Sequence, residues 1–349
     1  MFRTAYALLV TVLLLTCSAL VAESAQLSKY YCFTGRWDRQ QADRAITVNS
    51  GSYVQVRFTG SSVQALFDVS VNQPPMPTLA WRIDNGEWQE AEVSAKVLLA
   101  DGLSKGKHTV MLMARGLDEH QSRWKAPLVA SITFLGLELS KDGKVMKPLA
   151  EWTKPKLKME FLGDSITEGV LVQDSRPGKT TWPWRTDGRM GYAGQTAVLL
   201  GAAWRQVGFG ATGLAHGGSG GAPGALESFS FFHANCPRDN WQPDLVVINQ
   251  GTNDGRMAAD AYQPLYTQYL AMIRMAYPHA KIAAMRPLNG AQEASIRAAV
   301  TTCQTAGDKL VYFIDTTGWY SGALHPNADS CTKIAAQLAE ALKTQVLSK

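Results

Sequence analysis

The fold is decided by the stretch LKMEFLGDSITEG, residues 157–169. An apolar run from Leu157 to Leu162 ends at Gly163, and Ser165 follows at a turn into a helix-forming segment. Short apolar runs of this kind are typical of buried strands in parallel sheets, and open α/β sheets gather functional groups at the carboxyl ends of their strands. The stretch therefore predicts a parallel α/β sheet with Ser165 at its functional edge.

The same alternation of apolar run and helix-period segment continues through the second half of the chain. Four further apolar runs are predicted strands: Arg205 to Phe209, Leu245 to Asn249, Ile282 to Met285 and Leu310 to Ile314. Four segments are predicted helices: Tyr192 to Trp204, Ala261 to Tyr277, Gln292 to Cys303 and Cys331 to Leu347. Strands alternating with helices indicate right-handed βαβ units and a three-layer α/β domain over residues 157–349.

The region before this domain has a different period. Over residues 25–152, short runs alternate with turns, and the runs predicted as strands are Tyr53 to Phe58, Ser62 to Phe67, Leu79 to Ile83, His108 to Met113 and Leu128 to Leu139. Period-two alternation between turn residues predicts an antiparallel β-sandwich or jelly roll with its own core. The segment 153–156, which reads TKPK, is the natural linker between the two domains.

Length, charge and the N-terminal sequence indicate the number of domains, the compartment and the binding partners of the protein. At 349 residues the chain is long enough for two domains. Residues 1–24 contain Arg3, an apolar stretch from Ala5 to Leu15 and small residues thereafter, which is the layout of a cleaved secretory signal. We therefore expect a secreted or periplasmic protein. The net charge of +5, without a dense Lys/Arg block, argues against nucleic-acid binding, and no later stretch is apolar and long enough for a membrane span.

Four cysteines remain after the leader: Cys32, Cys236, Cys303 and Cys331. An even set in an oxidising compartment favours one or two disulfides. Cys303 and Cys331 could bridge across the final strand, and the alternative is that some of the four are buried thiols. No two cysteines have the close Cys-x-x-Cys spacing of a zinc site and the histidines are scattered, so the sequence implies no metal and no cofactor.

A serine nucleophile needs hydrogen-bond donors that stabilise the oxyanion, and the sequence offers candidates for them. Ser165 begins a helix, where its backbone N–H is unpaired and can stabilise a negative charge. Asn253, in Gly251-Thr252-Asn253-Asp254, follows a predicted strand, so its amide could donate to a developing oxyanion. A glycine-rich segment, residues 208–213, is expected to add a backbone N–H, and Gly213 and Gly210 both fit that role.

The general base is predicted to be His325. It lies in Leu324-His325-Pro326-Asn327, between the last predicted strand and the last helix, where a loop could place it over Ser165. Serine, histidine and oxyanion donors in this order predict acyl transfer through an acyl-enzyme.

The ordered set resembles the SGNH (GDSL-type) hydrolases, which have a flavodoxin-like fold. The resemblance implies Ser165 as nucleophile, His325 as base, and an oxyanion hole made by the N–H groups of Ser165 and Gly213 and the amide of Asn253. With the N-terminal β-domain, the segments 103–110, 134–139 and 160–167 resemble carbohydrate esterase family 2, which joins a jelly-roll domain to an SGNH domain. That family removes acetyl groups from plant polysaccharides and needs no cofactor.

One position departs from the SGNH pattern. The family commonly has an Asp three residues before the histidine, and here that position is Gly322. Carbohydrate esterase family 2, which this chain resembles, is described as working with a Ser-His dyad whose imidazole is held by backbone carbonyls. We therefore expect no carboxylate at His325 Nδ1, although Asp315 and Asp329 are possible substitutes.

The sequence thus predicts a secreted serine esterase that removes acetyl groups from a polysaccharide of xylan or glucomannan type, acting as a monomer. Three aromatic residues in loops near the predicted site, Trp182, Trp319 and Tyr320, are expected to stack on sugar rings. Two alternatives remain open. One is a lysophospholipase or thioesterase, which would use the same residues with an apolar groove, and the other is a non-catalytic carbohydrate-binding protein.

Overall fold

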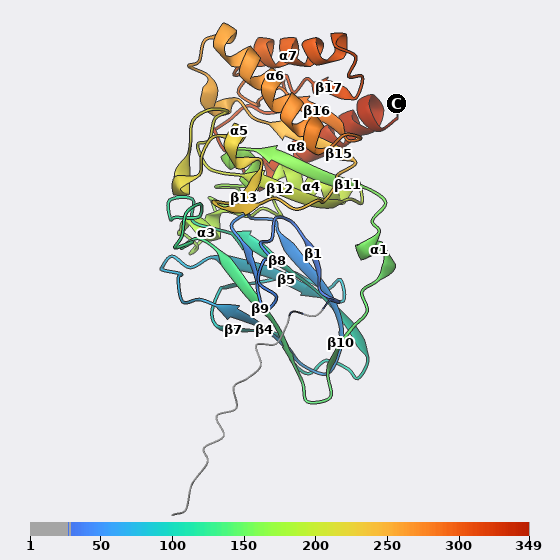
Figure 1. Ribbon diagram of the computed structural model, residues 1–349. Helices are drawn as coiled ribbons and strands as arrows, with labels where there is room; N and C mark the ends of the chain where they lie inside the picture. The colour runs from blue at the N-terminus through green and yellow to red at the C-terminus, as the bar shows by residue number, and fades with distance from the viewer. Residues whose placement is uncertain (1–26, 28, 349) are drawn as a thin grey trace, which may run out of the picture.

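The computed structural model describes residue 27 and residues 29–348, and it has an antiparallel β-sandwich below a parallel α/β layer structure (Figure 1). The predicted leader, residues 1–24, lies outside the described residues.

The sandwich consists of two facing antiparallel sheets. One has the strand order β1–β3–β8–β5–β6, with β10 also paired to β3, and the other has the order β2–β9–β4–β7. The strands are β1 Cys32–Thr34, β2 Ala45–Thr47, β3 Tyr53–Thr59, β4 Val63–Asp68, β5 Thr78–Ile83, β6 Gln89–Glu92, β7 Lys96–Ala100, β8 Lys107–Gly116, β9 Ile132–Leu139 and β10 Lys144–Met146. In β4 every second residue is buried, as a strand with one face on a core requires. The predicted sandwich is confirmed, but its short strands β1, β2, β6, β7 and β10 were not predicted, because three to five residues give little periodicity.

The second part is a parallel sheet with the order β12–β11–β15–β16–β17. Its strands are β11 Lys158–Gly163, β12 Ala203–Gly208, β15 Leu245–Asn249, β16 Lys281–Met285 and β17 Val311–Ile314, and a separate hairpin joins β13 Phe231–His233 to β14 Cys236–Pro237. The helices are α1 Ala150–Thr153, α2 Ser165–Glu168, α3 Trp182–Arg185, α4 Tyr192–Leu199, α5 Ala225–Ser228, α6 Ala259–Ala276, α7 Glu293–Thr305 and α8 Ala328–Ala341, with short turns η1 Ser219–Gly221, η2 Thr252–Asp254 and η3 Leu342–Leu347. The strand order reverses direction between β11 and β15, and this switch point is where doubly wound sheets open a crevice.

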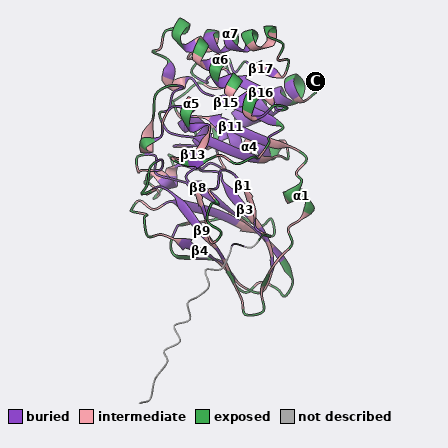
Figure 2. Ribbon diagram, viewed as in Figure 1, coloured by how far each residue is buried: buried purple, intermediate pink, exposed green. Residues whose placement is uncertain are grey.

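Helices cover both faces of this sheet. Residues of α6 and α7 share one core cluster with Val246 and Ile282, and residues of α4 and α8 share another with Val247 and Ala283. Figure 2 shows the strands β11 and β15 buried between these layers, with exposed residues on outer elements such as α1 and α7. The three-layer α/β fold is therefore confirmed.

Two sequence predictions need correction. The helix predicted over residues 192–204 ends at Leu199, because the chain turns at Gly201 with a φ of 62° and Trp204 belongs to β12. The proposed Cys303–Cys331 bridge is also wrong. The two residues pack against core clusters on opposite faces of the sheet, and all four described cysteines are free thiols.

Buried arginines of the sandwich join it to the α/β domain. Arg115 donates to the carbonyls of Pro183, Trp184 and Thr186, each at 3.0 Å. Arg123 forms a buried ion pair with Glu168 at the end of α2. Removing one partner of such a buried pair leaves an uncompensated buried charge, so these contacts favour association of the two domains.

No helix in the described part of the chain is long and apolar enough to cross a membrane.

Candidate active site

Ser165 stands at the turn from β11 into α2. The chain can turn this tightly because residue 163 is glycine, since a Cβ there would lie 2.6 Å from the carbonyl oxygen of Asn249. The Asp164 side chain caps the helix by accepting the N–H of Ile166 at 3.0 Å. As the first residue of α2, Ser165 has a backbone N–H without a helical acceptor, so this group is available to an anion.

His325 reaches Ser165 from the loop before α8. Its Nε2 lies 2.9 Å from Ser165 Oγ. Asn327 caps α8 by accepting the N–H of Ser330 at 2.9 Å, which fixes where the loop meets the helix. Burial lowers the pKa of His325 below its usual value, and the negative charge of Asp174 opposes that shift. The ring is therefore neutral at physiological pH, with a basic nitrogen facing the serine hydroxyl.

Asn253 lies at the same edge, in η2 after β15. Its Nδ2 donates to the carbonyl of Thr212 at 3.0 Å and, over a longer 3.4 Å, to Asp164 Oδ2 beside the serine. The longer contact is the weaker one. The structure thus brings Ser165, His325 and Asn253 together at the switch point between β11 and β15.

Gly213 is not placed as predicted. Its N–H donates to the carbonyl of His216 at 3.2 Å, so it is already paired. The N–H of Gly210, the other predicted candidate, has no acceptor among the described residues and is available to an oxyanion. Sequence alone could not separate them, because the difference depends on where His216 turns its carbonyl.

A carboxylate of the sandwich domain lies against Gly210. A Cβ built on Gly210 would lie only 1.6 Å from Glu119 Oε2. Burial and the nearby Glu168 carboxylate raise the pKa of Glu119 to about 7. Sequence reasoning did not find Glu119, because it belongs to the other domain and no motif surrounds it.

At the position of the usual SGNH aspartate, a side chain would meet Tyr320. A Cβ on Gly322 would lie 2.7 Å from the hydroxyl oxygen of Tyr320, which donates to the carbonyl of Ala323 at 2.6 Å. The backbone carbonyl that we expected at His325 Nδ1 is also not found: among the described residues, the hydrogen bond of the His325 ring is the one between Nε2 and Ser165 Oγ.

Neither proposed substitute carboxylate contacts His325. Asp315 accepts hydrogen bonds from Thr317 and pairs with Arg297 at 3.4 Å. Asp329 is exposed in the first turn of α8. Within the described residues, no carboxylate lies within ion-pair distance of His325, and the acidic group that lines its pocket is Asp174.

The three predicted sugar-binding aromatics have different surroundings. Tyr320 lines the pocket that contains His325. Trp319 packs against the core cluster between the sheet and α8. Trp182, half-buried in α3, stacks on His120 of the sandwich with ring centroids 4.7 Å apart. Of these three residues, Tyr320 is the one that shares a described pocket with the predicted base, His325.

A serine paired with a histidine at the carboxyl edge of a parallel sheet defines the class of α/β serine hydrolases. Residues 161–341 match the GDSL-like lipase/acylhydrolase family, and the chain belongs to that family. Residues 33–148 match the N-terminal domain described as carbohydrate esterase 2 N-terminal. Both predicted resemblances are confirmed.

Named relatives agree with this assignment. The chain is 26% identical over 346 residues to the cellulase/esterase CelE of Acetivibrio thermocellus, covering 90% of this chain and 39% of that relative's length. A family two carbohydrate esterase from Clostridium thermocellum, solved with cellohexaose, is 24% identical with a TM-score of 0.74, over 90% of this chain and 98% of that one. An acetyl xylan esterase from the rumen bacterium Butyrivibrio proteoclasticus is 21% identical with a TM-score of 0.70, over 91% and 97%. These two structures share the two-domain fold.

Proposed function

We propose that this protein is a secreted serine esterase that removes acetyl groups from an acetylated polysaccharide of the xylan or glucomannan type. The observation that carries the proposal is the 2.9 Å contact between His325 Nε2 and Ser165 Oγ, at the switch point of an acylhydrolase-family sheet. The polysaccharide is supported by the matched N-terminal domain and by the relatives named for carbohydrate esters. Export is supported by the sequence of residues 1–24 alone.

The reaction follows from the positions of these groups. His325 Nε2 takes the proton of Ser165 Oγ as the oxygen attacks the acetyl carbonyl. The carbonyl oxygen becomes an oxyanion, which accepts hydrogen bonds from the N–H groups of Ser165 and Gly210 and from Asn253 Nδ2. For Asn253, the oxyanion would replace the long contact to Asp164. Donors of this kind are each worth about 2.7–4 kcal/mol of barrier.

The second half of the reaction uses the same groups in reverse. Protonated His325 gives its proton to the ester oxygen of the sugar, so the sugar leaves as an alcohol and an acetyl ester remains on Ser165. Water, deprotonated by His325, then attacks this ester, and His325 returns the proton to Ser165 Oγ as acetate leaves. The charge of Asp174 favours the imidazolium that exists between these steps.

The deciding experiment measures acetate release from acetylated xylan, glucomannan, pectin and peptidoglycan. The proposal expects release from xylan or glucomannan, abolished by Ser165→Ala, with the thermal midpoint of that variant close to wild type. A profile of nitrophenyl esters separates the alternatives: preference for long acyl chains would indicate a lipase or thioesterase. Glycan binding without any acetate release would indicate a non-catalytic binding protein.

A further inference from the structure

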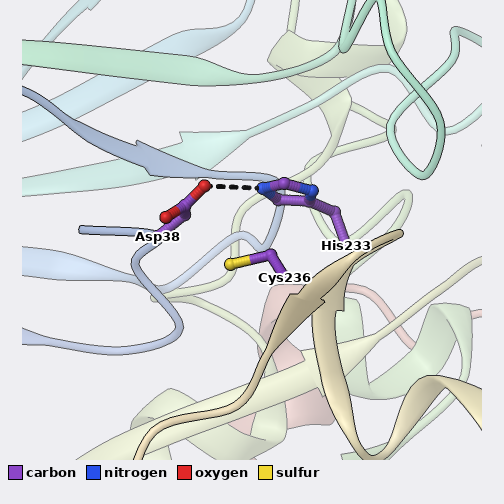
Figure 3. Close-up of side chains that lie close together, drawn as sticks. All are labelled: Asp38, His233 and Cys236. Atoms are coloured by element: carbon purple, nitrogen blue, oxygen red, sulfur yellow. Dashed lines mark hydrogen bonds and ion pairs between the residues drawn. The ribbon is translucent and has the colours of Figure 1, made fainter. Parts of the chain in front are cut away.

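A second cluster of reactive side chains lies away from Ser165, where the β13–β14 hairpin meets the sandwich. His233 and Cys236 are cross-strand neighbours on this hairpin, and Asp38 approaches them from the loop after β1 (Figure 3). His233 Nε2 lies 3.0 Å from Asp38 Oδ2, and one ligand atom from each of the three residues lies within 4.8 Å of the others. Cys236 is 3% exposed, whereas the side chains of Asp38 and His233 are each 14% exposed. The cluster is thus buried on the sulfur side and open to solvent on the other.

The two ring nitrogens of His233 have different partners. Nδ1 lies 3.1 Å from the carbonyl oxygen of Ala234, which only accepts hydrogen bonds, so Nδ1 carries a proton. In the neutral ring, the lone pair of Nε2 would point at the Asp38 carboxylate, so this contact is favourable when Nε2 holds a positive partner, either a proton or a metal ion. Histidines that bind metals typically donate their other N–H to a backbone carbonyl in this way.

The cluster is not arranged as a cysteine nucleophile with its base. Neither ring nitrogen of His233 hydrogen-bonds to Cys236 Sγ, which instead accepts from Gln40 Nε2 at 3.4 Å. Burial, reinforced by the Asp38 charge, raises the pKa of Cys236 to about 12, whereas activated cysteines have lowered pKa values. A bound divalent cation would supply the positive charge that a buried thiolate needs.

Both sides of the cluster are held in place by other contacts. Arg36, two residues before Asp38, donates at 2.9 Å to the carbonyls of Phe229 and Phe231, next to the hairpin. The backbone of Asp38 exchanges hydrogen bonds of 2.8 and 2.9 Å with Ile46. The ligand atoms are therefore pre-organised. In a tetrahedral zinc site they would lie about 3.3–3.7 Å apart, so only small shifts are needed.

We propose that Asp38, His233 and Cys236 bind one zinc ion, with solvent in the remaining position. One carboxylate, one imidazole and one thiolate select zinc or cobalt over magnesium or calcium, which prefer oxygen ligands. The ion would fasten the sandwich to a hairpin 195 residues away in sequence. From the sequence we expected no metal. The His-x-x-Cys spacing of residues 233–236 was a signal, but Asp38 is too distant in sequence to be joined to it.

The test uses the full mature chain, stripped of metal and without a histidine tag. Titration with Co²⁺ should give one bound ion per chain, with ligand-field bands in the visible and a thiolate charge-transfer band in the near ultraviolet. Competition with a chromophoric chelator gives the zinc affinity. Zinc, but not Mg²⁺ or Ca²⁺, should raise the thermal midpoint.

Three variants separate this site from the rest of the protein. Cys236→Ser should lose the charge-transfer band and at least about tenfold in zinc affinity, since even partners of ligands are worth about 10–100-fold. Cys303→Ser, which changes a thiol on α7, is the matched control and should bind as wild type. Ser165→Ala should also bind as wild type, so the outcome does not depend on the esterase proposal. Absence of binding, or an unchanged band in Cys236→Ser, would overturn the proposal.

Discussion

Replacing Gly210 by alanine should force a methyl group into the space of the Glu119 carboxylate. The new Cβ would lie 1.6 Å from Glu119 Oε2 and 3.2 Å from Ser219 Oγ. Because ordinary contacts are about 3.5–4 Å, the carboxylate or the glycine must move by about 2 Å. The φ of Gly210 is not in the left-handed region, so alanine adds no backbone strain of its own.

The displacement matters because Gly210 carries the unpaired N–H proposed to stabilise the oxyanion. A misplacement of about 1 Å can cost about 10²-fold, and loss of a donor costs about 10²–10³-fold in kcat. Gly210→Ala should therefore lower kcat for nitrophenyl acetate by about 10²–10³, with KM nearly unchanged, since the donor acts mainly in the transition state. Steady-state kinetics measure kcat and KM, and a thermal melt of the same sample checks that the variant is folded.

A second substitution distinguishes the steric cause from others. Glu119→Ala removes the carboxylate, and alanine at position 210 still has its N–H, so the double variant should recover most of the activity lost in Gly210→Ala. Glu119→Ala alone is the control. If Gly210→Ala turns over near the wild-type rate, or if the double variant is as slow as Gly210→Ala, a steric clash with Glu119 does not control the oxyanion donor.

Three further predictions follow from the same geometry. Asn253→Ala should lower kcat by about 10²–10³, and an unchanged kcat would make Asn253 a turn residue only. The base form of His325 is lost as pH falls through its lowered pKa. Asp174→Asn removes the charge that raises this pKa and should move the acid limb of kcat/KM to lower pH; a limb at the wild-type pH would contradict the assignment. Glu119 loses its proton as pH rises through about 7 and puts a negative charge beside Gly210, so kcat should fall on the alkaline side. Glu119→Gln should abolish that fall, and an identical alkaline limb would show that Glu119 does not act on the site.

The residues that lie together at the sheet edge were the most predictable part of the molecule. Ser165 and Asn253 each follow an apolar run, and the carboxyl ends of neighbouring parallel strands meet at one edge. His325 was predictable for the same reason, because its loop joins a strand to a helix. The order of the strands in the sheet could not be predicted from the sequence, but the residues of the site could be predicted without it.

What could not be predicted depends on contacts between distant segments. Gly213 and Gly210 have similar sequence surroundings and differ in the carbonyl of His216. Glu119 reaches Gly210 from another domain. The Cys303–Cys331 pairing failed because sequence spacing does not tell which face of the sheet a helix covers.

The central claim, that His325 activates Ser165 as the nucleophile, is tested most directly by mass spectrometry after treatment with a fluorophosphonate. Such reagents phosphonylate activated serines, because an ordinary serine hydroxyl is a weak nucleophile. We expect a single phosphonyl group, on the peptide containing Ser165, and no labelling in His325→Ala under the same conditions. Labelling at another serine would show that Ser165 is not the nucleophile. Acetate release by Ser165→Ala at the wild-type rate would show the same.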